Sequence, residues 1–296
     1  MAKRVKIGLI YSYNTHWVAG AYYILNLVQA LNTQKDEDKP ELIILSHTQE
    51  EFNTIRDTGY PYLKFHPLVK EDFAPSYSIT ERAINKLFRT VTGKNIIQKI
   101  HTRKKLSVDI DLLFPASTHI FFSGIKNRLF WIPDFQEHFL PHFFSEEEIQ
   151  IRKKHQLFLS QSCSIVFSSN DAASHFKQLY PASTAKIYVL PFAVTHPSFS
   201  ELPIETVLSK YEITQPYFFC PNQVWQHKNH ITVLKAIKKL KEEGEENVLV
   251  AFSGKEYDNR HPGVFEGLKR YISENGLEKN AKFLGFIDRK EQLQLM

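Results

Sequence analysis

The residues with the clearest chemical potential lie at 221–230, which read PNQVWQHKNH. They follow an apolar run at 217–220 and precede an amphipathic stretch at 231–240, so the expected order is strand, polar turn and helix. The N–H groups and the dipole at a helix amino terminus attract anions, and Lys228, expected in the first turn, adds a full positive charge. This combination predicts contact with a phosphorylated ligand.

The same side chains also have purely structural interpretations. Lys228 could be a solvated helix lysine, and Trp225 could fill a core rather than stack on a ligand. His227 and His230 resemble metal ligands only by residue type, because no Cys, Asp or Glu lies nearby at ligand spacing. Capping, packing or hydrogen bonding is the better expectation for both histidines, and we predict no metal site.

Length and composition indicate what class of protein carries these residues. A chain of 296 residues suggests about two domains, and 43% hydrophobic with 23% charged residues is ordinary for a globular protein. Apolar runs stay well short of the roughly 18 residues that span a bilayer, and the amino terminus lacks a signal-peptide core, so we expect a cytoplasmic protein. Cys163 and Cys220 fit no ligand or redox spacing. The net charge of +5 is mild, and no motif indicates nucleic-acid binding.

Apolar runs alternate with helical patterns along the chain. Buried strands are expected at 5–11, 41–45, 110–114, 129–132, 164–167 and 187–190. Helices are expected around 24–31 and 48–57, from a capping box at Ser145 to about Ser160, and from Asn170. This alternation predicts an α/β protein with a parallel sheet.

The pattern breaks in the Pro-containing segment 193–215 and then restarts. Strands are expected at 217–220, 248–252 and 281–284, with helices from His230 and at 264–275. We therefore predict two Rossmann-like domains, 1–192 and 216–296, joined by a linker at 193–215. About three strands is few for such a domain, and a helix beginning near Asp288 has no stop signal, so the second domain is expected to be incomplete and truncated.

Several patches, taken together and in order, resemble the retaining glycosyltransferases of family 4. They lie at 17–27, 131–136, 140–141, 143–145, 167–170, 189–192, 221–230, 252–255 and 283–287, so they extend over essentially the whole chain. The 222–230 patch beside the Asp134 patch resembles a bacterial subgroup that acts in surface-polysaccharide assembly. The resemblance implies the GT-B fold, with two Rossmann-like domains facing across a cleft.

The resemblance also implies an activity. Such an enzyme moves a hexose from a nucleotide-diphosphate sugar, UDP- or GDP-linked, to a glycan or lipid-linked acceptor with retention of configuration. It needs neither a metal nor another cofactor, because positive side chains and helix termini offset the charge on the leaving diphosphate. Lys228 matches the family's diphosphate lysine. Asn222 stands where the family has an arginine, so Gln223, His227 or a residue elsewhere would supply that contact.

The remaining site residues follow from the same resemblance. Gly20 would let the first loop approach the diphosphate, a contact that needs a small residue, although it could simply allow close helix packing. The second domain would line the nucleotide cleft with Ser253, Gly254 and Lys255, and would border the base with Phe286 and Ile287. One of three residues in the loop after a central strand would face the transferred sugar: Asp134, Gln136 or His138. That loop could instead hydrogen-bond its own backbone.

One family feature is absent from the sequence. The family has two glutamates separated by seven residues shortly after the region of Gly285, and the sequence ends first. If Met296 were the natural terminus, donor binding would lose its principal carboxylates and the chain would be inactive; if the chain is a fragment, the complete protein is expected to be an ordinary enzyme of the family. The alternatives are a non-catalytic nucleotide-sugar-binding or partner subunit, and an epimerase of sugar nucleotides with the same fold.

A basic stretch runs from Lys86 to Lys105 and includes three isoleucines. As an amphipathic helix it could lie on anionic lipid at the inner face of the membrane, which would suit a lipid-linked acceptor. The plainer interpretation is a charged, solvated surface.

Overall fold

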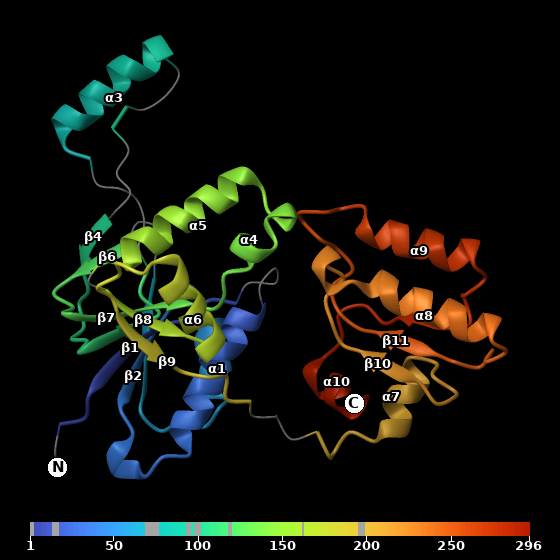
Figure 1. Ribbon diagram of the computed structural model, residues 1–296. Coiled ribbons are helices and arrows are strands. Elements are labelled where there is room, and N and C mark those ends of the chain that lie inside the picture. The colour runs from blue at the N-terminus through green and yellow to red at the C-terminus, as the bar shows by residue number, and fades with distance from the viewer. Residues whose placement is uncertain are drawn as a thin grey trace. The chain divides into compact units, whose positions relative to one another are not determined.

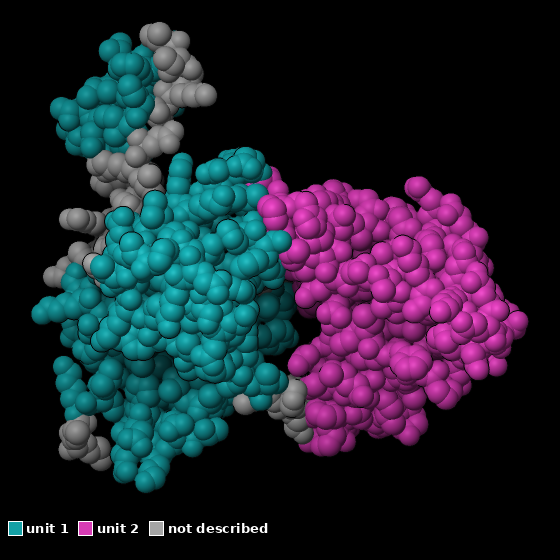
Figure 2. Space-filling model, in the orientation of Figure 1, with its two compact units in different colours: residues 1–139, 146–195 teal, residues 140–145, 196–296 magenta. Residues whose placement is uncertain are grey.

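The computed structural model describes residues 3–13, 18–68, 77–92, 96–97, 102–117, 120–161, 163–194 and 199–296. The chain divides into two compact units, which Figures 1 and 2 show. Unit 1 contains residues 1–139 and 146–195, and unit 2 contains residues 140–145 and 196–296. Trp17, in the first patch of the resemblance, lies outside the described residues.

Unit 1 is built on a parallel sheet, which in the described part of the chain has the order β3-β2-β1-β5-β7-β8-β9. Its strands are β1 (Lys6–Ile10), β2 (Glu41–Ser46), β3 (Leu63–Pro67), β5 (Leu112–Phe114), β7 (Asn127–Ile132), β8 (Ser164–Phe167) and β9 (Lys186–Val189). The chain builds β2 and β3 on one side of β1 and the later strands on the other. This order places a topological switch point between β1 and β5, as in Rossmann-type sheets.

Helices cover both faces of this sheet (Figure 1). They are α1 (Val18–Asn32), α2 (Gln49–Arg56), α4 (Gln136–Phe139), α5 (Glu146–Leu159) and α6 (Asn170–Leu179). In β2, Leu42 and Ile44 face one buried cluster with α1 and α2, whereas Ile43 and Leu45 face another with α5 and α6. A strand buried on both faces in this way reads as a continuous apolar run, which is why the sequence predicted it.

Two helix starts show why local sequence fixes these boundaries. Thr48 forms a capping box with Glu51: the Thr48 hydroxyl accepts from the Glu51 N–H at 3.2 Å, and the Glu51 carboxylate accepts from the Thr48 N–H at 3.3 Å. Ser169 caps α6 by accepting from the Ala172 N–H at 3.0 Å.

Within the described ranges, no helix is long and apolar enough to cross a membrane.

The basic stretch from Lys86 to Lys105 is not one continuous amphipathic helix. Helix α3 (Ile79–Thr92) ends just before Gly93, a residue that disfavours helix. Residues 102–105 instead form strand β4 (Thr102–Lys105), which pairs in parallel with β6 (Ile120–Ser123). Lys94 and Lys99 lie outside the described residues. No pattern in the sequence predicted β3, β4 or β6.

Unit 2 has a smaller parallel sheet of the order β10-β11-β12 in the part of the chain that is described. Its elements are α7 (Ile204–Lys210), β10 (Phe218–Cys220), the 3-10 helix η4 (Gln226–Lys228), α8 (His230–Glu242), β11 (Val250–Phe252), α9 (Val264–Glu274), β12 (Ala281–Phe283) and α10 (Arg289–Gln294). Leu234 and Leu268 of α8 and α9 pack on one face of β11, and Val207 and Leu295 pack on the other. Residues 217–220, 248–252 and 281–284 therefore contain the three strands that the sequence predicts.

The segment predicted as a linker, 193–215, contains structure that belongs to unit 2. Val207 of α7 is buried with Ala251 and Leu295, which ties α7 to the sheet. Glu291 of α10 also accepts a hydrogen bond from the Tyr211 hydroxyl at 2.7 Å. The sequence indicates a short helical piece near 204–211 inside this segment, which α7 confirms. Burial of one face of that helix makes it part of unit 2 rather than of a linker.

Candidate functional site

The site residues predicted for unit 2 lie on three loops at the carboxyl ends of β10, β11 and β12. Backbone hydrogen bonds join these loops: the Val224 N–H donates to the Lys255 carbonyl at 3.0 Å, and the Gly254 N–H donates to the Gly285 carbonyl at 2.8 Å. Open α/β sheets bind ligands outside the carboxyl ends of their strands. The structure therefore gathers the following predicted residues at one such edge: Asn222, Gln223, His227, Lys228, Ser253, Gly254, Lys255, Phe286 and Ile287.

Gly254 allows the first two loops to touch. Its φ of 148° lies in a region that side chains disfavour, and a Cβ built there would overlap the Asn222 carbonyl oxygen and lie 2.7 Å from the Gln223 Cα. The sequence predicted that Gly254 lines a nucleotide cleft. In the structure its lack of a side chain is needed first for contact between loops.

The sequence predicted Lys228 in the first turn of α8, but the structure places it before that helix. It ends η4, in which the Lys228 N–H donates to the Trp225 carbonyl at 2.9 Å, and Asn229 separates η4 from α8. Asn229 has left-handed φ and ψ angles of 56° and 41°, which Asn tolerates better than most residues. The lysine is exposed and stands one residue before the helix.

The amino terminus of α8 keeps its orientation toward the same edge. Asn229, its N-cap residue, makes no side-chain hydrogen bond to the first turn. The leading N–H groups of a helix have no partner inside the helix and carry its positive dipole end. Lys228 and this terminus together provide positive potential beside the loop of Asn222 and Gln223.

Asp258, which the sequence analysis missed, holds η4 in place. Its buried carboxylate accepts from the Gln226 N–H at 2.9 Å through one oxygen. The other oxygen accepts from the Arg260 N–H at 2.9 Å and the His261 N–H at 3.3 Å. An Asp at the start of a turn, as at 258–261, is a local pattern that a sequence can reveal. The bond to Gln226 joins residues 32 apart in the chain, so no local pattern predicts it.

Buried polar atoms accumulate below these loops. Ser253 is 2% exposed, and its hydroxyl has no hydrogen-bond partner within the described part of the chain; the same holds for the Gln223 side-chain oxygen. Burying a polar group without a partner costs about 1–3 kcal/mol, and native proteins contain few such groups. Their position at the carboxyl edge of the sheet suits contact with a polar ligand.

His230, the first residue of α8, is 3% exposed and packs its ring against Phe252 at 5.7 Å between centroids. Burial lowers the pKa of His230, the positive charge of Lys228 lowers it further, and the backbone at Asn222 opposes the shift. Within the described residues, neither ring nitrogen of His230 has a hydrogen-bond partner. A neutral imidazole is therefore favoured beneath the loop.

Residues 140–145 belong to unit 2, whereas the sequence placed them in the first domain. The Phe143 ring lies 5.8 Å from the His227 ring and 6.1 Å from the His261 ring, between centroids. The Arg260 guanidinium lies 4.5 Å above the Phe144 ring. Aromatic contacts of this kind, which link distant residues, are invisible to a local reading of the sequence.

The two residues predicted to border a base differ from each other. Phe286 is exposed, at 61%, and is free to contact a ligand from the loop after β12. Ile287 is partly buried and packs with the α7–α10 cluster. Its side chain therefore serves the core, and only its backbone could contribute to the predicted base contact.

The four remaining predicted residues lie in unit 1. Asp134 follows β7 and binds its own loop: its carboxylate accepts from the Gln136 N–H at 3.3 Å and from the Gln136 amide at 3.1 Å. His138 is exposed and packs edge-on against Phe139, with centroids 5.0 Å apart. Gly20 is buried in the first turn of α1, at the carboxyl edge of β1.

The buried carboxylate of that loop belongs to Glu137, which the sequence analysis passed over. Glu137 is 2% exposed, accepts a hydrogen bond from the Gln156 amide, and forms an ion pair with Arg152 at 3.4 Å. The Tyr180 hydroxyl donates to Gln156 at 2.9 Å, and burial together with the Glu137 charge raises the Tyr180 pKa. These contacts fix α4 on α5 and thereby position Asp134, Gln136 and His138.

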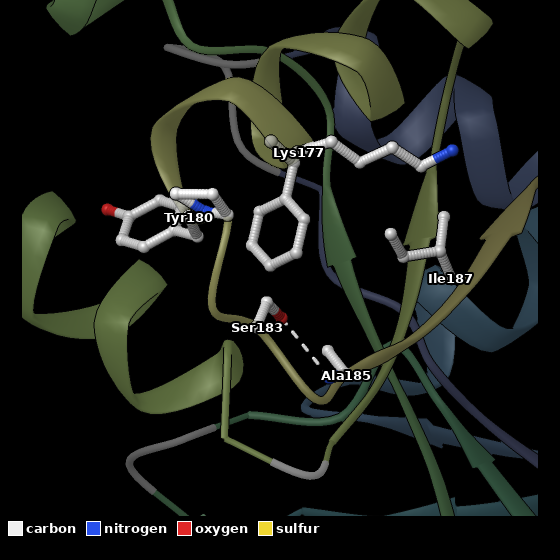
Figure 3. Close-up of a pocket in the computed structure, with 7 residues that line it drawn as sticks. Lys177, Tyr180, Ser183, Ala185 and Ile187 are labelled. Carbon is white, nitrogen blue, oxygen red and sulfur yellow. Dashed lines mark hydrogen bonds between the residues drawn. The ribbon is translucent and has the colours of Figure 1, made fainter.

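A pocket of about 220 Å³ lies elsewhere in unit 1, between the end of α6 and the start of β9 (Figure 3). Its lining is largely apolar and contains none of the predicted site residues; it consists of Phe176, Lys177, Tyr180, Pro181, Ser183, Ala185 and Ile187. Because β9 begins here, the pocket is at the amino edge of the sheet. Ligands of such folds bind at the opposite edge.

Comparison with known proteins bears on the fold. No family model matches the sequence, and no curated protein matches it. A glycosyltransferase from Rickettsia africae ESF-5 superimposes with a TM-score of 0.55 at 13% identity, covering 99% of this chain and 71% of that chain. The chain has a GT-B-like α/β fold.

HepE from Anabaena matches similarly in two complexes. With UDP and glucose bound, it superimposes with a TM-score of 0.55 at 14% identity, covering 98% of this chain and 71% of HepE. With UDP-glucose bound, the TM-score is 0.55 at 14% identity, covering 97% and 71%. At such identities the similarity concerns the fold alone.

Proposed function

We propose that the protein is a retaining glycosyltransferase that moves a hexose from a nucleotide-diphosphate sugar to a glycan or glycolipid acceptor in polysaccharide biosynthesis. The observation that carries this proposal is the joined set of three loops in unit 2. They place Lys228, the terminus of α8 and the buried polar atoms of Ser253 and Gln223 at one sheet edge. HepE, which shares the fold, has been crystallised with UDP and UDP-glucose.

The chemistry of the loops suits a diphosphate leaving group. As the bond from the sugar to the diphosphate breaks, negative charge grows on the phosphate oxygens, and fixed positive charge lowers the energy of that state. Lys228 and the α8 dipole supply such charge without a metal ion. Asn222 replaces the second cation that the family resemblance leads one to expect, so Gln223 and His227 would add neutral hydrogen bonds instead.

The test measures nucleotide binding by the chain through thermal unfolding and calorimetry. UDP or GDP should raise the melting temperature, and Lys228→Ala should weaken binding about tenfold, the loss of one charge-assisted contact. Lys235→Ala removes an exposed lysine from the body of α8 and should leave affinity unchanged. Absence of stabilisation by both nucleotides would refute the proposal.

Turnover assays separate the transferase from its alternatives. Release of nucleoside diphosphate that depends on an added acceptor supports a glycosyltransferase. Conversion of the donor sugar without an acceptor indicates an epimerase, and binding without turnover indicates a nucleotide-sugar-binding or partner subunit. One of Asp134, Gln136 and His138 should then be required for turnover but not for nucleotide binding.

A further inference from the structure

His230 is a titratable side chain buried at the amino terminus of α8. Its ring is 3% exposed and packs on Phe252 of β11, with 5.7 Å between centroids. Neither ring nitrogen has a hydrogen-bond partner among the described residues, although a buried polar atom ordinarily has one. One nitrogen of a neutral imidazole carries no hydrogen, so His230 can take up a proton there without losing an existing hydrogen bond.

The electrostatic surroundings of the ring are mainly positive. Burial lowers the pKa of His230 most, the charge of Lys228 in η4 lowers it further, and the backbone at Asn222, after β10, raises it. The first turn of α8 contains no acidic residue, and its dipole adds positive potential. The packed elements carry further titratable groups: His227 of η4, Cys220 of β10, Lys255, Glu256 and Asp258 after β11, and the exposed Glu266, Lys269, Arg270 and Glu274 of α9. Among the charged side chains of the described residues, Lys228 has the largest effect on His230.

A bound diphosphate would reverse the sign of this potential. The proposed ligand brings negative charge to the sheet edge where Lys228 and the α8 terminus lie, and a nearby anion favours the protonated form of a histidine. We propose that His230 takes up a proton when a nucleotide-diphosphate sugar binds and thereby supplies a second positive charge, in place of the arginine that Asn222 replaces. This inference rests on the proposed function, because that function requires the diphosphate.

The burial of His230 gives it two advantages for this role. In the free protein the ring is neutral, so it does not repel Lys228 before the anion arrives. Once protonated, it acts through its charge rather than by contact, and a charge inside the fold acts on an anion through a lower effective dielectric constant than an exposed charge. His227 is partly exposed and its ring lies against Trp225, at 5.4 Å between centroids, so water screens its charge more.

Proton uptake makes nucleotide affinity depend on pH in a fixed direction. The complex holds the proton more tightly than the free protein does, so affinity rises as the pH falls through the pKa that His230 has in the complex. Each unit between the two pKa values corresponds to a tenfold change in affinity. We expect a gain of about three- to tenfold between pH 8 and pH 5.5.

The experiment is titration calorimetry of the full chain with UDP-glucose and with GDP-mannose, in buffers that differ in ionisation enthalpy. Nucleotide sugars are used because a free nucleoside diphosphate has a terminal phosphate that itself titrates at about pH 6, whereas the sugar esterifies that phosphate. The slope of the observed enthalpy against the ionisation enthalpy of the buffer counts the protons. It should show uptake of roughly 0.3 proton or more per bound ligand at pH 6 and almost none at pH 8.

Variants assign the proton to its residue. His230→Gln and His230→Asn should both lose the uptake and the gain in affinity at low pH, and melting curves at pH 8 identify any variant that fails to fold. His155→Gln, on α5 of unit 1, is the matched control and should retain the uptake.

Three outcomes would overturn the inference: no uptake in the unmodified protein, uptake that persists in a folded His230 variant, or uptake lost in His227→Gln and kept in His230→Gln. Each of them, with binding intact, leaves the proposed function standing. No binding of either nucleotide sugar would refute both.

Discussion

The Cα of Gly254 lies so close to Asn222 that any side chain at position 254 would overlap the Asn222 carbonyl. The loops that follow β10 and β11 thereby form one surface, and the Val224 and Gly254 N–H groups extend the contact to Lys255 and Gly285.

Gly254→Ala should disrupt this surface. The added Cβ would force the loops apart and would hold a φ of 148° that alanine disfavours, so we expect a loss of about 2–4 kcal/mol in stability and weaker nucleotide binding. Chemical denaturation and calorimetry measure the two effects. Gly267→Ala is the matched control: its Cβ meets nothing within 4 Å inside α9, so stability should rise by about 0.5–1 kcal/mol. A neutral effect at position 254 would contradict the described contact.

Asp258→Ala should release η4 from the loop at 258–261. Three N–H groups lose an acceptor, among them the Gln226 N–H at the start of η4, so the expected cost is about 1–3 kcal/mol of stability. Nucleotide affinity should fall as well, because Lys228 ends the released turn. Asp171→Ala changes an exposed carboxylate of α6 and should affect neither quantity. Unchanged affinity in Asp258→Ala would separate η4 from the ligand site.

His230 makes stability depend on pH in a defined direction. Its pKa in the folded protein is lowered from 6.5, chiefly by burial, so below pH 6.5 the unfolded state takes up a proton more readily than the folded state. This contribution is complete above pH 6.5 and is lost as the pH falls toward the lowered value. The melting temperature of the unmodified protein should therefore drop more between pH 7 and pH 5 than that of His230→Gln. His138→Gln, at an exposed histidine, should track the unmodified protein; parallel curves for all three would exclude the effect.

Removal of divalent ions tests the proposed chemistry. If Lys228 and the α8 terminus alone balance the diphosphate charge, EDTA should change the affinity for UDP or GDP less than about twofold. Titration calorimetry with and without EDTA measures this, and the same measurement on Lys228→Ala shows whether a metal replaces the lost cation. Loss of binding in EDTA that Mg²⁺ restores would contradict metal-independent binding.

Sequence predicted the elements whose pattern is local. Strand β8 has the predicted limits 164–167, and α2 has the polar start with Thr48 that the pattern indicated. The sequence did not reveal strand β3 because β3 lies at the edge of the described sheet, has no fully buried residue and ends in Pro67, a residue that discourages a strand prediction. The sequence thus predicted buried parallel strands better than exposed or charged ones.

The residues of the candidate site could be predicted from their types and positions in the sequence. The contacts that hold those residues in place could not. Residues after three strands had to meet at one edge of a parallel sheet, which placed Asn222, Ser253 and Phe286 together. The bond from Asp258 to Gln226 and the packing of Phe143 on His227 connect residues that no local pattern relates. The left-handed Asn229, which moved Lys228 out of α8, likewise depends on three-dimensional context.

Asn229 has a consequence for how the anion-binding surface opens. Lys228 is held through η4 and Asp258 to the loops of β11, whereas one residue of left-handed backbone joins η4 to α8. Fraying of the first turn of α8 can therefore exchange its amide hydrogens with solvent while the Gln226 amide stays protected. The fixed charge and the helix dipole, which act on the same anion, belong to segments with separate opening equilibria.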